Sequence, residues 1–118
     1  MKAIALNTPG GIDQLHAIDV APRDPGPSDI QVEIKATSLN FHDYAVVVGL
    51  LPVDDGRIPM SDGAGVVTAV GDAVTDFAVG DNVISHFFPN WISGRPGMKN
   101  LLGVPGDHID GFASQTVT

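Results

Sequence analysis

Cysteine is absent from the 118 residues of this sequence. Its absence excludes disulfide bonds, catalysis by a thiolate, and a zinc site built from thiolate ligands. Long apolar runs are absent too, and none approaches the roughly 20 residues that a membrane-spanning helix needs. The apolar stretch in the opening "MKAIALN" is too short for the core of a signal peptide. We therefore expect a cytoplasmic protein with no membrane partner.

Basic residues are scarce: 6 Lys and Arg oppose 14 Asp and Glu, which gives a net charge of −8. This balance repels a polyanion, so we expect no nucleic-acid partner. Glutamate is almost absent, because Glu33 is the one Glu among the acidic residues. Aspartate favours turns and caps, and the chain also has 14 Gly and 9 Pro. With 43% hydrophobic residues, the composition predicts one compact, turn-rich, mainly β domain over residues 1–118.

Several short segments have the pattern of β-strands. The clearest spans residues 30–39, where Ile30, Val32 and Ile34 alternate with polar residues. A period of two predicts one buried face and one wet face. The other expected strands are residues 2–6, 15–20, 65–70, 82–87 and 111–118.

The segment after the clearest strand has the pattern of a short helix. Asn40 can be its N-cap, Asp43 lies in its first turn, and Gly49 can end it. Residues 88–110 show no regular pattern, which predicts a long irregular loop of functional or mobile character. The sequence stops inside the last expected strand, so we expect the chain to be one part of a longer protein.

The stretch "DGAGVV" (residues 62–67) raises the question of a phosphate-binding loop. The dinucleotide motif requires a third glycine where this chain has Thr68, and a helix after the loop. The following "VVTAV" is rich in β-branched residues and favours a strand instead. We predict that Gly63 and Gly65 allow close backbone approach at a strand entry.

The order of the motifs "DIQVEIKATSLNFHDYAVVVG" and "IPMSDGAGVVTAVGDAVTDFAVGDNV" resembles the N-terminal domain of the medium-chain dehydrogenase/reductase superfamily. The zinc-free, quinone oxidoreductase-like branch is the most similar. The resemblance implies a GroES-like β-barrel over residues 1–118, with a short helix and a long irregular loop. It also implies a Rossmann domain, absent from this chain, that makes most of the contacts with the cofactor, NADP or NAD. The active site would lie in the cleft between the two domains, and the intact enzyme would be a homo-oligomer.

The resemblance also assigns positions in that cleft. Zinc-dependent relatives carry a His where this chain has Ser61, and a Cys where it has Asn40. Asp62 occupies the place of the Glu in the same motif of these zinc-dependent relatives. A hydroxyl and a carboxamide are poor zinc ligands, so the resemblance implies that no zinc is bound.

Asn40 and His42 are the predicted catalytic residues. Asn40 can donate to a substrate carbonyl or a nicotinamide ribose, but it can equally be only a helix cap. His42 replaces a proton-relaying Ser or Thr of the zinc enzymes, and an imidazole can donate a proton near neutral pH. The alternative is a solvent-facing helix residue. We predict that Asn40, Phe41 and His42 contact the cofactor.

The predicted substrate-binding residues are Ser61, Asp62, Phe87, Phe88 and Trp91. The three aromatic residues can line an apolar pocket for a flat substrate such as a quinone or enone. They can also simply pack the irregular loop onto the barrel. Asp62 can likewise be an ordinary turn carboxylate.

We therefore expect a zinc-independent, NAD(P)H-dependent oxidoreductase that transfers hydride to a quinone, enone or carbonyl of a small-molecule substrate. The cofactor carries this chemistry, and the chain alone should be inactive. The alternative is a GroES-like binding or co-chaperone module without catalysis, because a fold does not fix a function. Such a module would need a mobile loop at residues 38–44.

Overall fold

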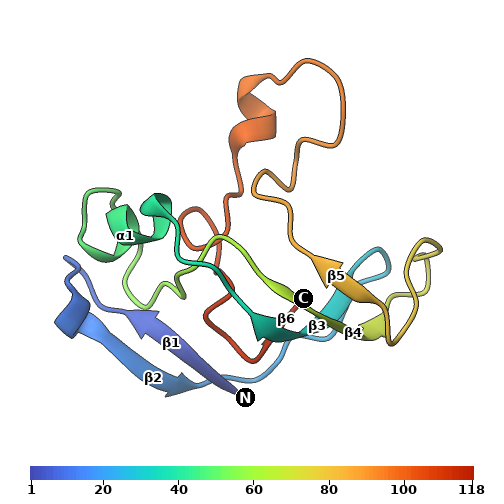
Figure 1. Cartoon of the computed structure of the whole chain (residues 1–118), viewed down its shortest axis with the longest axis horizontal. Helices are drawn as coiled ribbons and strands as arrows, with labels where there is room; N and C mark the ends of the chain where they lie inside the picture. Colours follow the sequence, from blue (N-terminus) through green and yellow to red (C-terminus); the bar gives the residue numbers. More distant parts are fainter.

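A computed structural model describes residues 1–118 and contains two antiparallel sheets and one short helix (Figure 1). Strands β1 (Lys2–Leu6) and β2 (Leu15–Asp19) form a two-stranded sheet. The second sheet has the order β5-β4-β3-β6. It consists of β3 (Ile30–Ala36), β4 (Ala64–Val70), β5 (Asn82–Ile84) and β6 (Thr116–Val117). These elements confirm the expected mainly β, GroES-like fold.

Helix α1 (Phe41–Val47) follows β3 and confirms the predicted helix. Asn40 is its N-cap with extended backbone, and the Asp43 carboxylate accepts a hydrogen bond from the Asn40 N–H at 2.8 Å. Gly49 follows with a φ of 80°, a conformation that favours glycine, and ends the helix. Two 3₁₀ turns, Ile12–Gln14 and Met98–Leu101, complete the regular structure. None of these helices is long and apolar enough to cross a membrane.

The last segment of the chain, residues 111–118, connects the two sheets. The N–H of Ile4 in β1 donates to Ala113 at 2.8 Å, and the N–H of Ile34 in β3 donates to Gln115 at 2.9 Å. Only Thr116 and Val117 form a regular ladder with β3. The predicted strand over residues 111–118 is therefore too long, because residues 111–113 bond to the irregular segment 58–60 instead.

The core is small and is formed by residues of β1, α1, β4 and two irregular segments. Its buried apolar residues are Ala3, Ala5, Leu6, Ala45, Val46, Ile58, Val67 and Val104. The sequence predicts that one face of β3 is buried; in the structure the apolar residues of that face are only half-buried. Ile30, Val32 and Ile34 instead line a cavity of about 560 Å³ together with Val83 and Phe112.

The glycines at the entry of β4 allow close packing, as predicted. A Cβ on Gly65 would overlap the carbonyl oxygen of Glu33 in β3, and one on Gly63 would overlap the ring of Phe112. The segment leads into strand β4 and no helix follows it. The "DGAG" stretch therefore serves strand packing, and it lacks the helix that a pyrophosphate site requires.

Residues 85–106 form a protruding lobe between β5 and the last segment (Figure 1). The lobe is held by side-chain amides: Asn90 donates to the Leu102 carbonyl and Asn100 donates to the Asn90 carbonyl, both at 2.9 Å. Apart from one 3₁₀ turn it is irregular, as the sequence predicts. Hydrogen bonds thus fix the shape of a segment that has no strand or α-helix.

Candidate active-site cleft

The candidate cleft lies where β3 ends and β4 begins. Thr37 and Ser38 follow β3, and Asp62 and Gly63 precede β4. Together with Ala36, Ala64, Ile84 and Ser85 they line an open cavity of about 300 Å³. Because β3 and β4 pair antiparallel, the end of one strand and the start of the other meet at the same edge.

Asp62 is the centre of a polar network in this cleft. Its carboxylate accepts hydrogen bonds from the amide of Asn40 at 2.6 Å and from the hydroxyl of Ser38 at 3.1 Å. The hydroxyl of Thr37 donates to the Asp62 carbonyl at 2.6 Å. The amide of Asn40 also reaches the hydroxyl of Ser61 at 3.4 Å. Both donor hydrogens of Asn40 are therefore engaged inside the protein.

Asp43 supports this network through the backbone of Asn40 and Ser61. Its side chain is 1% exposed, and its carboxylate accepts the N–H of Asn40 at 2.8 Å and the N–H of Ser61 at 2.7 Å. These bonds tie the start of α1 to the segment before β4. The sequence signal for this role is the spacing of Asn40 and Asp43, which matches a capping box.

His42 is not among the residues that line the cleft. Its Nε2 lies 3.4 Å from the carboxylate of Asp107, and its Nδ1 lies 3.7 Å from Asp43. Its ring contacts Phe87 edge-on, with 5.2 Å between ring centroids. His42 thus links α1 to the lobe, and its role as a proton donor stays a prediction.

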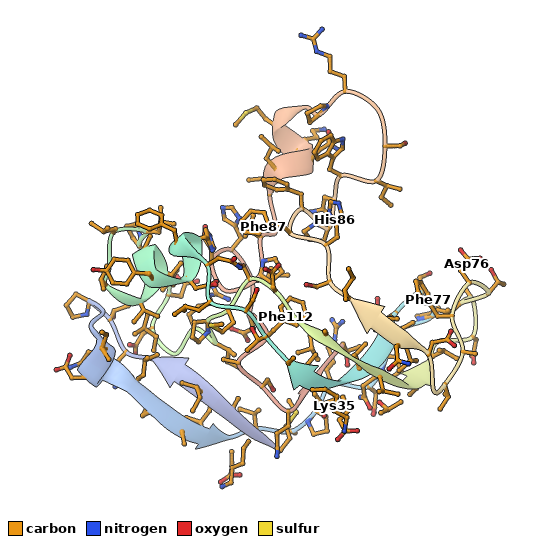
Figure 2. The ribbon with its side chains drawn as sticks, viewed as in Figure 1. Lys35, Asp76, Phe77, His86, Phe87 and Phe112 are labelled. Carbon is orange, nitrogen blue, oxygen red and sulfur yellow. The ribbon has the colours of Figure 1, made fainter.

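The three aromatic residues of the lobe pack on one another. The ring centroids of Phe87 and Phe88 are 4.8 Å apart, and those of Phe88 and Trp91 are 6.4 Å apart. Trp91 Nε1 donates to the Gly94 carbonyl at 2.9 Å. Figure 2 shows Phe87 at the base of the lobe, on the side of α1. These contacts favour the interpretation that the aromatic residues pack the loop.

The structure brings some predicted site residues together and separates others. Asp62 lines the cleft, and Asn40 lies directly behind it. Ser61 is fully buried, whereas Phe41 is 77% exposed on the outer surface of α1. Residues 38–44, which a co-chaperone module would need as a mobile loop, instead contain the anchored start of a helix.

Ser85 is a cleft residue that the sequence did not indicate. Its hydroxyl oxygen accepts the N–H of Gly63 at 2.9 Å, while its own hydrogen has no protein acceptor. The hydroxyls of Thr37 and Ser38 both donate to Asp62. Ser85 is therefore the hydroxyl in the cleft lining whose hydrogen is free. A lone Ser after a short strand has no spacing signal that could have identified it.

The fold and the cleft define the chain as a GroES-like domain of the medium-chain dehydrogenase/reductase type. The alcohol dehydrogenase GroES-like domain family matches residues 26–118, and the chain belongs to this family. A zinc-type alcohol dehydrogenase-like protein of Schizosaccharomyces pombe is 39% identical over 89 residues, which cover 73% of this chain and 26% of that protein.

Two solved structures are also similar. The NADPH complex of Escherichia coli quinone oxidoreductase has a TM-score of 0.66 and 34% identity, over 71% of this chain and 26% of that one. An NAD-dependent alcohol dehydrogenase has a TM-score of 0.83 and 31% identity, over 99% of this chain and 36% of that one. The chain thus spans about a quarter to a third of the length of these relatives.

Proposed function

We propose that this chain forms the substrate side of the catalytic cleft in a zinc-independent, NAD(P)H-dependent oxidoreductase. The observation that carries the proposal is the Asn40–Asp62 hydrogen bond of 2.6 Å, together with the Asn40–Ser61 contact of 3.4 Å. By resemblance, Asn40 and Ser61 stand where zinc-dependent relatives place metal ligands. In this chain these two positions are joined to each other and to Asp62, and the network needs no metal.

The residues present do not fit a zinc ion. Zinc prefers thiolate, imidazole and carboxylate donors. The lone pair of the Asn40 amide nitrogen is delocalised into the carbonyl group, so this nitrogen donates hydrogen bonds and is not a metal ligand; the Ser61 hydroxyl is fully buried. Asp62 is the one strong ligand in the network, and its carboxylate already accepts two hydrogen bonds.

The proposed reaction is the reduction of a quinone, an enone or a carbonyl compound. When bound, the nicotinamide cofactor supplies the hydride. Charge then develops on the substrate oxygen, and a fixed hydrogen-bond donor stabilises this charge. The free hydroxyl of Ser85 in the cleft lining suits this role. Asp62 would hold Asn40 and Ser38 in place.

The cofactor would be bound mainly by another domain, with contacts from this chain at the start of α1. Phe41 is 77% exposed and Leu39 is 78% exposed, so both offer apolar surface beside the cleft. An exposed aromatic ring can contact a flat nicotinamide. Asn40 and His42 would contact the cofactor only if their side chains left their present partners, Asp62 and Ser61 for Asn40 and Asp107 for His42.

A domain replacement tests the proposal. This chain would replace the corresponding domain of Escherichia coli quinone oxidoreductase, with which it shares 34% identity. We expect the hybrid to oxidise NADPH in the presence of 1,4-benzoquinone. Ser85→Ala should lower kcat by about 10-fold or more, because one hydrogen bond to the reduced oxygen is lost. Ser85→Thr keeps the hydroxyl and should recover most of the rate.

The hybrid also separates binding from chemistry. A hybrid that folds and binds NADPH, but reduces no quinone, enone or aldehyde, would contradict the proposed function. Equal kcat values for the Ala and Thr variants would contradict the role of Ser85 alone. Retention of one zinc per chain after chelator treatment, measured by elemental analysis, would contradict zinc independence.

A further inference from the structure

The protruding lobe, residues 85–106, differs in charge from the rest of the chain. It contains Arg95 and Lys99 and no acidic residue, so all 14 acidic residues lie elsewhere. The other four Lys and Arg residues each form an ion pair with a carboxylate. Arg95 and Lys99 are exposed and have no such partner. The lobe therefore carries two unpaired positive charges on an acidic protein.

The lobe also exposes large apolar side chains. Ile92 is 93% exposed, Met98 is 79% exposed and Leu102 is 52% exposed. The segment that carries them is held by the hydrogen bonds of Asn90 and Asn100. An ordered surface that combines exposed apolar groups with unpaired charge is typical of a protein–protein contact.

A complementary surface lies on the connection between β4 and β5, residues 71–81, here called the acidic turn. Asp72, Asp76 and Asp81 are exposed in it and form no ion pair. Phe77 is 46% exposed and Val79 is 63% exposed. Figure 2 shows Asp76 and Phe77 next to each other at the outer edge of the molecule.

A hollow of about 240 Å³ lies at the base of the acidic turn. Its apolar lining includes Ile30, Ala73, Val74 and Phe77, and Asp76 lies at the same hollow. An apolar side chain of the lobe could enter it while a neighbouring cation meets the carboxylate. The acidic turn thus offers an apolar hollow and negative charge. The lobe offers exposed apolar side chains and positive charge.

The two surfaces cannot meet within one molecule. The lobe rises from the sheet, whereas the acidic turn lies at a separate corner (Figure 1). Each copy therefore has both halves of one contact. We infer that the lobe of one copy docks on the acidic turn of a second copy. A two-fold arrangement forms this contact twice and closes the pair. Contacts of lobe with lobe, or of turn with turn, would oppose like charges.

Sedimentation velocity of the full 118-residue chain tests the inference. At about 100 µM protein and about 50 mM NaCl, we expect a dimer. Raising NaCl to about 500 mM should weaken the dimer at least tenfold, because exposed ion pairs are screened. Arg95→Asp with Lys99→Asp should give a monomer, and so should Asp72→Lys with Asp76→Lys.

Mixing the two double variants provides the decisive measurement. One has an acidic lobe and the other a basic turn, so both contacts of a mixed pair regain opposite charges, and the dimer should return. Asp24→Lys is the control: Asp24 is exposed and forms no ion pair, so this change should leave the dimer intact. Circular dichroism checks that each variant is folded.

Three results would overturn the inference. A wild-type chain that stays monomeric at low salt would do so. A dimer that survives both double variants would place the contact elsewhere, for example on the half-buried face of β3. A mixture of the two variants that stays monomeric would show that the lobe and the acidic turn do not contact each other.

Discussion

Asp43 should contribute more to stability than any other carboxylate described above. It is 1% exposed, and its two oxygens accept the N–H groups of Asn40 and Ser61 at 2.8 and 2.7 Å. Asp43→Ala removes both acceptors and leaves two backbone donors without a partner in a region closed to water. Hydrogen bonds to a charged group contribute about 1.5–3 kcal/mol each, so we expect the loss of two to lower the free energy of unfolding by about 3–6 kcal/mol.

Asp43→Asn gives a graded version of the same perturbation. The amide keeps one acceptor oxygen and presents an NH₂ group to the other backbone N–H. We expect a loss of about 1.5–3 kcal/mol, between the wild type and the Ala variant. The variant also loses the favourable interaction of a negative charge with the start of α1.

Urea denaturation followed by circular dichroism measures both losses. Asp24→Ala is the matched control, because Asp24 is exposed and free of ion pairs. It should change the free energy of unfolding by less than about 0.5 kcal/mol. If Asp43→Ala also stays within about 0.5 kcal/mol of the wild type, the proposed tie between α1 and the β4 entry is refuted.

Three further predictions concern packing and the polar network. Gly65→Ala should cost more than about 3 kcal/mol in urea denaturation because its Cβ overlaps backbone, whereas Gly97→Ala, with no atom closer than 3.6 Å, should be tolerated. His42→Ala should speed tryptic cleavage in the lobe, because the lobe loses its contact with α1; His16→Ala, on the exposed side of β2, should not. Asn40→Asp should lower the melting temperature, because it places a second carboxylate 2.6 Å from an existing one, and added salt should recover part of the loss.

Local sequence patterns determined most of the secondary structure. The alternation in residues 30–36 predicted β3, because side chains of a strand alternate between two faces. Asn40, Asp43 and Gly49 predicted both ends of α1, because capping is a property of neighbouring residues. The β-branched run after Gly65 predicted a strand in place of a phosphate loop.

The contacts that the polar side chains make depend on long-range packing. Asn40 was predicted to contact substrate or cofactor, or else only to cap the helix; the bond of its amide to Asp62, 22 residues away, is a contact that local spacing does not indicate. His42 turns to Asp107, 65 residues away, and the free hydroxyl of Ser85 appears only once β4 and β5 are paired. Such pairings depend on long-range packing of strands, and no local spacing encodes them. Patterns of neighbouring residues therefore suffice to locate most strands and the capped helix, whereas the packing of distant segments sets which polar groups remain free to act.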